Sequence, residues 1–250
     1  MKIAKVISNG KEIYAELKEG NYYPLKGDLY NYKGIENSPI KHVDKVLPPV
    51  MPTKIIAVGL NYNLHIVEFE ADIPKYPIIF LKPTSSIIGE GDTIILPKAS
   101  NRVDYEAEIA VVISKDCKNI KAGDAKDYIL GYTCLNDVTA RDLQKIDGQW
   151  TRSKGFDTFC PIGPCIETDL DCSDLRISAT LNGKIVQDSS TKHMLTNIPD
   201  LIEYISSIMT LYKGDIISTG TPSGIGGMKD GDVIEIFVEG IGTLTNKVSN

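Results

Sequence analysis

The sequence has few of the features that mark nucleic-acid-binding, exported or membrane proteins. Lysine and arginine number 27 against 33 aspartates and glutamates, a formal net charge of −6, and no stretch gathers a basic cluster. Because phosphate backbones need such a cluster, we do not expect nucleic acid as a partner. The N-terminus lacks the apolar core of a signal peptide, and the most apolar later windows, Tyr76–Leu81 and Leu201–Tyr212, are far too short to span a membrane. We therefore expect a soluble, cytoplasmic protein with no membrane partner.

Cysteine is scarce and is not arranged for disulfides or metal. The five cysteines include no Cys-x-x-Cys pair, and an odd number without an export signal argues against a disulfide framework. Cys160 lies six residues from Lys154, so a thiolate nucleophile is conceivable, but none of the three histidines is near it in the sequence. We favour buried, reduced thiols.

The residues that are present are typical of a folded protein with two parts. Of the 250 residues, 42% are apolar and 24% charged, values close to globular averages. Short strand patterns separated by turns predict a small β unit at the N-terminus. Pro48, Pro49 and Pro52 suit a connection, so we place a boundary near residue 50, between a small N-terminal β domain (1–50) and a second domain (51–250).

Strand patterns outnumber helical ones along the whole chain. The predicted strands are Lys2–Val6, Lys11–Leu17, Tyr22–Leu25, Lys54–Val58, Pro77–Leu81, Thr93–Leu96, Tyr105–Ile113, Tyr128–Asn136, Leu175–Leu181, Asp215–Thr219, Val233–Val238 and Thr243–Val248. The Asn182-Gly183 and Asp230-Gly231 pairs predict hairpin turns.

Helices are predicted in three places only. Thr139–Ile146 begins with a Thr-x-x-Asp approximation to a capping box, and Ile198–Thr210 has apolar residues at a period of 3.6. A short helix can also form within Asn61–Glu70. The fold class is therefore mixed α+β, dominated by strands with few short helices.

Glu106 and Glu108 carry the strongest local signal for chemistry. Side chains alternate across a strand, so both carboxylates point the same way, while the opposite face is apolar. Two like charges held close together repel unless they are solvated, protonated or bound to a cation, and hard oxygen ligands suit Mg²⁺ or Ca²⁺. A solvent-exposed face is the alternative, although Ala110 and Val112 continue the same face as apolar residues.

A third carboxylate, Asp137, follows the predicted strand Tyr128–Asn136 and precedes the helix with Arg141 and Gln144, which are three residues apart and share a face. The end of a strand that opens into a helix is a usual place for a ligand. Taken alone, Asp137 is more often a helix cap and Arg141 more often part of a surface ion pair.

His65 and Glu68 have the spacing of a general-base pair. One helical turn would let the carboxylate orient and polarise the imidazole. By itself this spacing more often marks an exposed helix face.

Further on, the glycine-rich residues Ser218–Gly226 could hold a carboxylate or phosphate on backbone N–H groups, but they lack the Gly-Lys-Ser/Thr ending of a P-loop.

Taken together, these pieces resemble the fumarylacetoacetate hydrolase family over about residues 51–250. The resemblance rests on motifs in one order: Gly59-Leu60-Asn61-Tyr62-x-x-His65-x-x-Glu68, Phe80-Leu81-Lys82-Pro83, Glu106-x-Glu108, Asp137-Val138-Thr139-Ala140-Arg141-Asp142-x-Gln144, Lys154-Gly155-Phe156-Asp157 and Thr219-Gly220-Thr221-Pro222. Each motif is weak alone, but the ordered set is specific.

The resemblance implies a β-roll catalytic domain, usually homodimeric, around one divalent cation. Mg²⁺, or alternatively Mn²⁺ or Ca²⁺, is expected on Glu106, Glu108 and Asp137. His65, Glu68 and Lys154 are then expected to be catalytic, and Arg141, Gln144 and Thr221 to contact substrate.

The same resemblance implies an enzyme that acts on a 2-oxo acid through an enolate stabilised by the metal. We rank hydrolysis of a C–C bond in an acylpyruvate first, with a water activated by His65 and Glu68. The alternatives are a decarboxylase or keto–enol isomerase of an oxaloacetate-like or 2-hydroxydienoate dicarboxylate. A non-catalytic, metal-dependent small-molecule-binding protein is the alternative from a different class.

Overall fold

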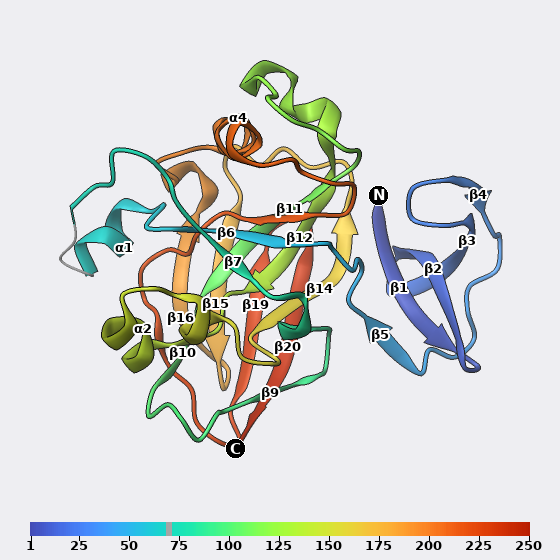
Figure 1. Ribbon diagram of the computed structural model, residues 1–250. Coiled ribbons are helices and arrows are strands. Elements are labelled where there is room, and N and C mark those ends of the chain that lie inside the picture. The colour runs from blue at the N-terminus through green and yellow to red at the C-terminus, as the bar shows by residue number, and fades with distance from the viewer. Residues whose placement is uncertain (69–71) are drawn as a thin grey trace.

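A large sheet organises the molecule. A computed structural model describes residues 1–68 and 72–250, and Figure 1 shows its elements. The path of the 12-stranded sheet is β4-β3-β2-β1-β14-β12-β11-β17-β6-β7, with β5 on β1 and β8 on β14. Its strands are β1 Lys2–Ser8, β2 Lys11–Lys18, β3 Asn21–Gly27, β4 Tyr32–Ile35, β5 Lys45–Leu47, β6 Ile55–Gly59, β7 Ile78–Lys82, β8 Ile87–Ile88, β11 Ala107–Ile113, β12 Ile129–Asn136, β14 Cys160–Glu167 and β17 Ile216–Ser218.

Two smaller sheets complete the strand framework. The five-stranded sheet has the order β16-β15-β19-β20-β9, and the three-stranded sheet has the order β13-β10-β18. Their strands are β9 Thr93–Ile95, β10 Val103–Tyr105, β13 Thr139–Ala140, β15 Arg176–Leu181, β16 Lys184–Ser190, β18 Gly226–Gly227, β19 Val233–Val238 and β20 Gly242–Ser249. The prediction of a strand-dominated α+β fold is confirmed.

Helices in the described residues are few and short. They are α1 Asn63–Glu68, α2 Arg141–Asp147, α3 Thr151–Lys154 and α4 Ile198–Ile208, with 3-10 turns at Thr84–Ser86, Ala122–Tyr128 and Thr191–His193. None of these described helices is long and apolar enough to cross a membrane.

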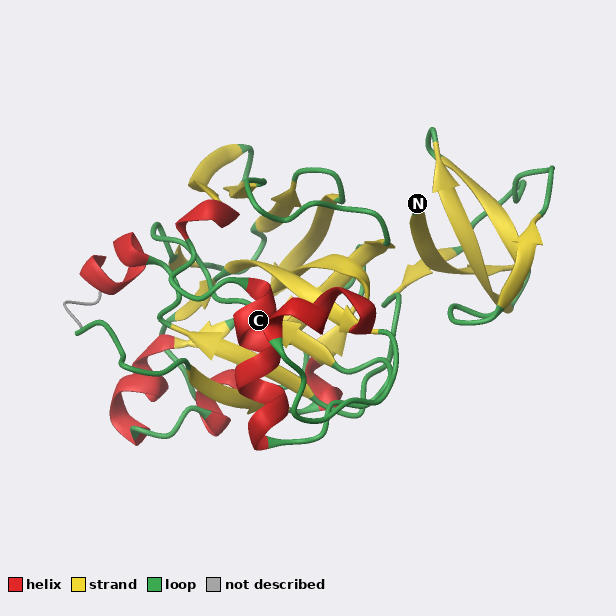
Figure 2. Ribbon diagram, turned by 90° about the horizontal axis from the view of Figure 1, so that it is seen from above, coloured by secondary structure: helices red, strands yellow, loops and turns green. Residues whose placement is uncertain are grey.

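The N-terminal strands lie to one side of the remaining strands, as Figures 1 and 2 both show. They nevertheless continue the large sheet, because β1 pairs with β14 through Lys2 opposite Glu167 and Ile3 opposite Ile166. The remaining pairings of β1 are with β2 and β5.

The core lies on both faces of the central strands. Between β11 and β12 and the five-stranded sheet, fully buried side chains such as Ile109, Cys134, Ile177 and Ile236 pack together. On the other side of the molecule, α4 packs its apolar face against β11, β6 and β17. Burying both faces holds the central strands rigidly, which is a requirement for a site built on their ends.

The predicted helix over Ile198–Thr210 is present as α4. The side chain of Asn197 caps it by accepting a hydrogen bond from the Asp200 N–H at 3.0 Å, and Pro199 lies in the first turn. Within Asn61–Glu70, the structure forms α1 up to Glu68. The last two residues of that predicted segment lie outside the described residues.

Several local predictions are wrong. Tyr105–Ile113 is broken at Glu106, because β10 pairs with β13 and β18 whereas β11 joins the large sheet. The capping box is not formed, since the Thr139 hydroxyl donates to the Asp137 carbonyl instead. Asp230-Gly231 is a turn but not a hairpin, because it joins strands of different sheets. Asn182-Gly183 does form the predicted hairpin, with φ of 52° and 77°.

Candidate active site

An acidic cluster forms where β11 begins and β12 ends. Glu106 lies directly before β11, Glu108 is its second residue, and Asp137 follows β12. The two strands are antiparallel, and the Asp137 N–H donates to the Glu106 carbonyl at 2.9 Å, which brings the three residues together. One carboxylate oxygen from each lies within 4.8 Å of the others, and all three side chains are buried.

The alternation of the strand places Glu106 and Glu108 on one side, as the sequence predicts. That side is not solvent-exposed, because Ala110 and Val112 continue it into a buried apolar cluster. The side chain of Asn136 supports the arrangement by accepting a hydrogen bond from the Glu106 N–H at 2.9 Å.

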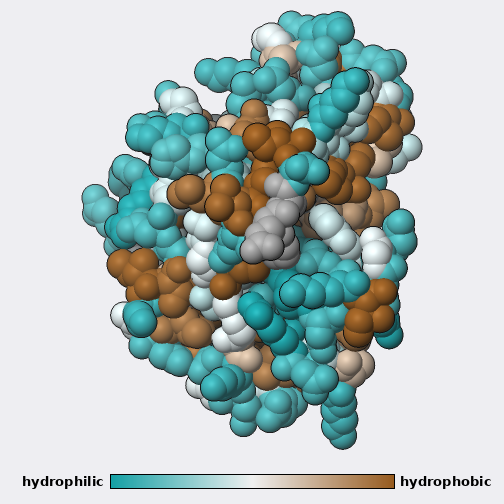
Figure 3. All heavy atoms as spheres, turned by 90° about the vertical axis from the view of Figure 1, so that its left-hand side faces the viewer, coloured by the Kyte–Doolittle hydropathy of each residue, from teal (hydrophilic) through white to brown (hydrophobic). Residues whose placement is uncertain are grey.

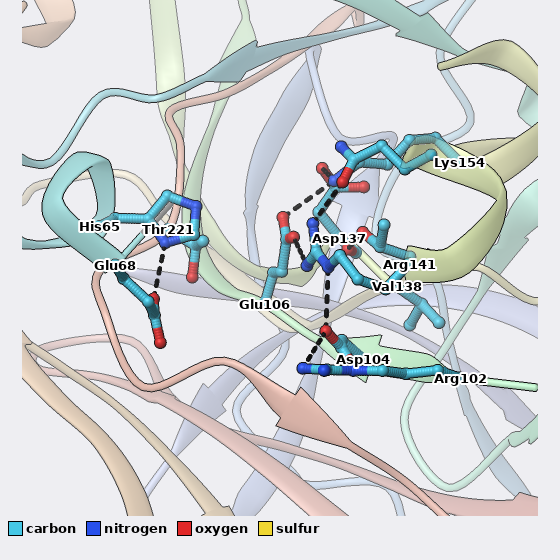
Figure 4. Close-up of polar contacts among 12 residues, drawn as sticks. His65, Glu68, Arg102, Asp104, Glu106, Asp137, Val138, Arg141, Lys154 and Thr221 are labelled. Carbon is cyan, nitrogen blue, oxygen red and sulfur yellow. Dashed lines mark hydrogen bonds and ion pairs between the residues drawn. The ribbon is translucent and has the colours of Figure 1, made fainter. Parts of the chain in front are cut away.

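Two buried lysines form ion pairs with the cluster, and Figure 4 shows one of them, Lys154, beside Glu106 and Asp137. Lys154, the last residue of α3, donates to Glu106 Oε2 at 2.9 Å and to Asp137 Oδ2 at 2.6 Å. Lys82, at the end of β7, donates to the other oxygen of Asp137. Burial acts to lower the pKa of Lys154, but Asp137 and Glu106 outweigh it and raise this pKa, so the ammonium form is maintained.

The two glutamates have opposite electrostatic environments. Burial acts to raise the pKa of Glu106, but Lys154 and Arg141 outweigh it and hold that pKa well below its ordinary value. No lysine or arginine of residues 1–68 and 72–250 forms an ion pair with Glu108. It accepts hydrogen bonds from Ser218 and, at 2.9 Å, from the Gly220 N–H. Burial, followed by the neighbouring Asp137 and Glu106, raises the pKa of Glu108 to about 8.

Arg141 is held in the cluster by three side chains. It pairs with Glu106, its Nε donates to Asp104 Oδ2 at 2.9 Å, and its Nη1 donates to Gln144 Oε1 at 2.6 Å. The shared helix face predicted for Arg141 and Gln144 is therefore confirmed on α2. The surface ion pair weighed for Arg141 is wrong, because its side chain is 4% exposed.

His65 and Glu68 form the predicted i, i+3 pair on α1. Nδ1 of the imidazole lies 3.0 Å from Glu68 Oε2, and Glu68 Oε1 accepts a hydrogen bond from the Gly224 N–H at 3.2 Å. The imidazole is buried rather than exposed. Burial lowers the pKa of His65, with Glu106 and Glu68 acting in the opposite direction, so the ring is neutral near pH 7.

One cavity of about 220 Å³ connects these groups. Its polar lining includes His65, Glu106, Glu108, Asp137, Arg141, Gln144, Lys154 and Thr221. Glu68 does not line the cavity, but it is hydrogen-bonded to His65, which does. Phe80 and Trp150 form an apolar wall, with ring centroids 5.1 Å apart. Gly59 permits this wall, because a Cβ there would meet the indole of Trp150 at 2.5 Å.

Sequence reasoning missed three buried residues that support the site. Lys82 lies within the Phe80-Leu81-Lys82-Pro83 motif, which by itself does not indicate a role for it, and Asp104 is the buried partner of both Arg102 and Arg141. Gln187 contacts Thr221 and also Ala107, which lies between Glu106 and Glu108 in what we call the acidic strand, the start of β11 together with Glu106. No local pattern marks Asp104 or Gln187, because the partners that connect them to the site, Arg141 and Thr221, are distant in sequence.

Cys160 has no features of a nucleophile. It is fully buried, and burial raises the pKa of its thiol to about 12. All five cysteines are free, in agreement with the prediction of reduced thiols.

The strand-rich fold therefore brings together a buried cluster of three carboxylates, the donor set of a metal site, with an oriented imidazole and an adjoining cavity. The family model described as "Fumarylacetoacetate (FAA) hydrolase C-terminal" matches residues 54–249. The chain therefore belongs to the fumarylacetoacetate hydrolase family and is an enzyme of that family.

Named relatives carry out more than one reaction. The mitochondrial oxaloacetate tautomerase Fahd2a of Rattus norvegicus is 46% identical over 84% of this chain and 71% of its own length. The structure of 5-carboxymethyl-2-hydroxymuconate delta-isomerase from Mycobacterium smegmatis is 42% identical, with a TM-score of 0.92 over 100% of this chain and 99% of its own. Maleylpyruvate hydrolase from Sphingobium sp. SYK-6, in complex with manganese(II) and pyruvate, is 28% identical, with a TM-score of 0.84 over 100% and 99% of the two chains.

Proposed function

We propose that Glu106, Glu108 and Asp137 bind one divalent cation, Mg²⁺ or Mn²⁺, next to a 2-oxo acid substrate. The donor set fits, since carboxylate oxygens are the ligands that these cations prefer and one from each residue lies within 4.8 Å of the others. The charge also fits, because Glu108 is buried without an ion-pair partner among the described residues and its pKa is raised to about 8. The complex of the Sphingobium relative with manganese(II) and pyruvate supports the same assignment.

When bound, the cation would stabilise the negative charge of an enolate formed from the 2-oxo acid. The residues of the chain supply the remaining functions. Lys154 and Arg141 are fixed cations beside the acidic cluster and attract an anionic substrate. Gln144 and Thr221 line the same cavity and supply polar contacts.

His65 is the proposed base. Glu68 accepts the Nδ1–H hydrogen bond, which leaves Nε2 unprotonated and able to take a proton. Because burial lowers the pKa of His65, the neutral form is available near pH 7. Glu68 is itself oriented by the Gly224 N–H, so the pair is fixed from both sides.

Keto–enol tautomerisation of a 2-oxo dicarboxylate of the oxaloacetate kind is the reaction that these observations favour. His65 would take the proton from the carbon next to the oxo group and return it to the oxo oxygen, which gives the enol, and would do the reverse in the other direction. The tautomerase and isomerase relatives are 46% and 42% identical, above the 28% of the hydrolase. This ranking places the isomerase alternative ahead of the hydrolysis that the sequence analysis ranks first.

The charge of the site supports a dianionic substrate. The buried carboxylates in and beside the cluster are equal in number to the cations around them, so a divalent cation would leave two positive charges. The carboxylates are Glu106, Glu108, Asp137 and Asp104, and the cations are Lys82, Lys154, Arg141 and Arg102. Lys145 also lines the cavity and is exposed, so it can meet a distal carboxylate.

Hydrolysis of an acylpyruvate C–C bond is the second candidate, and the His65–Glu68 pair is the observation that favours it. A neutral imidazole oriented by a carboxylate can activate a water as readily as it moves a substrate proton. Decarboxylation is less favoured, since it needs no such base.

The test is a panel of oxaloacetate and acylpyruvates, assayed with Mg²⁺, with Mn²⁺ and with excess chelator. We expect metal-dependent loss of the enol absorbance of oxaloacetate, and chelation should abolish it. Glu108→Gln should behave like the chelated protein, whereas the matched control Glu19→Gln, at an exposed turn, should not. Full activity in metal-free protein would refute the metal assignment, and hydrolysis without tautomerisation would reverse the ranking.

We also propose that the protein is a cytoplasmic homodimer. β7 is an edge strand of the large sheet, and large apolar side chains are exposed on it and nearby, including Leu81, Tyr76 and Ile73. Figure 3 shows apolar patches among hydrophilic side chains on the face of the molecule at the left of Figure 1. Covering an apolar edge strand is a common reason for association.

The two-domain division also remains our proposal. The N-terminal strands pair largely with one another, the family model begins at residue 54, and none of the described residues lining the cavity precedes Val58.

A further inference from the structure

The side-chain amide of Gln187 connects the acidic strand to the loop that carries Thr221. Oε1 accepts a hydrogen bond from the Ala107 N–H at 2.9 Å, and Ala107 lies between Glu106 and Glu108. Nε2 donates to Thr221 Oγ1 at 3.0 Å and to the Pro222 carbonyl at 2.7 Å. Gln187 is 1% exposed, and these three contacts occupy its acceptor and both its donors.

The orientation of this amide is fixed by its partners. The Ala107 N–H can only donate and the Pro222 carbonyl can only accept, so a flipped amide would lose both bonds. Nε2 is therefore the atom that faces Thr221. As a consequence, the Thr221 hydroxyl accepts a hydrogen bond from Gln187, and its own proton must point elsewhere.

A β-bulge aims Gln187 at the site. Along β16, Ile185 pairs with Thr180 and Gln187 pairs with Ala179, so one extra residue, Val186, is inserted on this strand. Bulges of this kind redirect side chains and occur next to active sites. The loop after Thr221 also lies directly on β16, because a Cβ at Gly224 would collide with the Val186 carbonyl.

We propose that Gln187 is a positioning residue that makes Thr221 a hydrogen-bond donor toward the substrate. Thr221 is buried and lines the cavity. With one lone pair taken by Gln187, its hydroxyl proton is directed to an anionic oxygen of the bound 2-oxo acid. The same amide fixes the spacing between this donor and the acidic strand. This inference rests on the proposed function, since it needs an anionic ligand in the cavity.

Substitutions at position 187 separate this role from simple packing. Gln187→Glu keeps an acceptor for the Ala107 N–H but cannot donate to Thr221, so the hydroxyl turns to donate to the new carboxylate. Gln187→Met keeps the volume and removes all three contacts, which leaves the hydroxyl free to rotate toward the ligand. A donor-directing role therefore predicts that Glu is worse than Met, whereas a packing role predicts that Met is at least as bad as Glu.

The experiment is calorimetry of pyruvate binding to the Mg²⁺-loaded protein, with Mg²⁺ affinity measured separately for each variant. We expect Thr221→Val to weaken pyruvate binding about tenfold or more, as for loss of a hydrogen bond to a charged group. Gln187→Glu should match this loss, Gln187→Met should lose less, and the exposed control Gln149→Glu should bind as wild type does.

A double-mutant cycle excludes a purely electrostatic effect of the new carboxylate. In the Thr221→Val background, Gln187→Glu should cause little further loss, because the hydroxyl on which it acts is absent. A further tenfold loss there, or equal binding by wild type and both Gln187 variants, would overturn the inference. If Gln187→Glu does not fold, the cycle of Gln187→Met with Thr221→Val decides, since additive losses would refute coupling. Failure of wild type itself to bind pyruvate with Mg²⁺ would instead refute the proposed function.

Discussion

Nδ1 of His65 lies 3.0 Å from Oε2 of Glu68, which leaves the other ring nitrogen as the basic atom. The carboxylate is anchored in turn by the Gly224 N–H on a loop far away in the sequence. A base that is oriented in this way can take a proton from a substrate carbon or from a water. Replacing this base by mutation therefore distinguishes these reactions from those that need no base.

We expect His65→Ala to lower kcat by about 10²–10⁴-fold for tautomerisation of oxaloacetate, the range typical of general base catalysis. Binding should change little, because Lys154 and the metal site remain, so the loss should fall on kcat. Steady-state kinetics with oxaloacetate and an acylpyruvate provide the measurement. Metal-dependent decarboxylation should be affected less. Equal kcat in wild type and variant for every substrate would show that His65 has no catalytic role.

The pH profile should report the same imidazole. Since burial lowers the pKa of His65, kcat/KM should rise with pH with an inflection below the ordinary histidine pKa of about 6.5. Glu68 acts to raise that pKa, so Glu68→Gln should move the acidic limb to lower pH. An unchanged or higher inflection in this variant would contradict the assignment. The exposed Glu19→Gln serves as the matched control.

Glu108 should make the metal-free protein less stable as pH rises. The pKa of Glu108 in the folded protein, about 8, lies above the ordinary value of 4.5. Its contribution to the free energy of unfolding is therefore fully present below about pH 4.5 and is lost as the pH rises toward 8. Chelated wild type should therefore lose Tm between pH 5 and 8 relative to Glu108→Gln. Mg²⁺ should reverse the order by stabilising wild type alone. Parallel Tm curves for the two chelated proteins would show that Glu108 is already ionised without penalty.

Lys82→Met should destabilise the protein without touching the cavity. It leaves Asp137 with a single cation, and breaking a buried ion pair costs about 3–5 kcal/mol in free energy of unfolding. Urea titration in chelator gives the value, and Mg²⁺ should recover part of the loss by compensating Asp137. Lys98→Met, at an exposed position, is the control. A loss below about 1 kcal/mol, typical of surface pairs, would argue that Lys82 is not needed to hold Asp137.

The oligomeric state provides a separate test of the exposed edge. We expect sedimentation at micromolar concentration to give a dimer. Leu81→Lys on β7, where the side chain is 49% exposed, should favour the monomer if this edge forms the interface. Glu19→Lys, at a turn of the N-terminal strands, should leave the dimer intact. A monomeric wild type would refute the proposal.

The sequence by itself determined the strand-rich class, the spacing of the candidate site residues and the family. Period-2 alternation placed Glu106 and Glu108 on one face, and helical spacing paired Arg141 with Gln144 and His65 with Glu68, since these relationships depend only on local geometry. Six ordered motifs then identified the family, which the match over residues 54–249 confirms.

The tertiary structure decided which of these groups are buried, charged and paired. Periodicity does not specify which strands pair, so the break at Glu106 and the strands β14 and β16 were missed. The ion pairs Lys82–Asp137 and Asp104–Arg141 and the hydrogen bonds of Gln187 join residues 34 to 80 positions apart. Such contacts form only when distant strands meet. The pKa values follow the same rule. Glu106 and Glu108 are only two residues apart, but packing brings Lys154 and Arg141 to Glu106 and pairs no lysine or arginine of the described residues with Glu108.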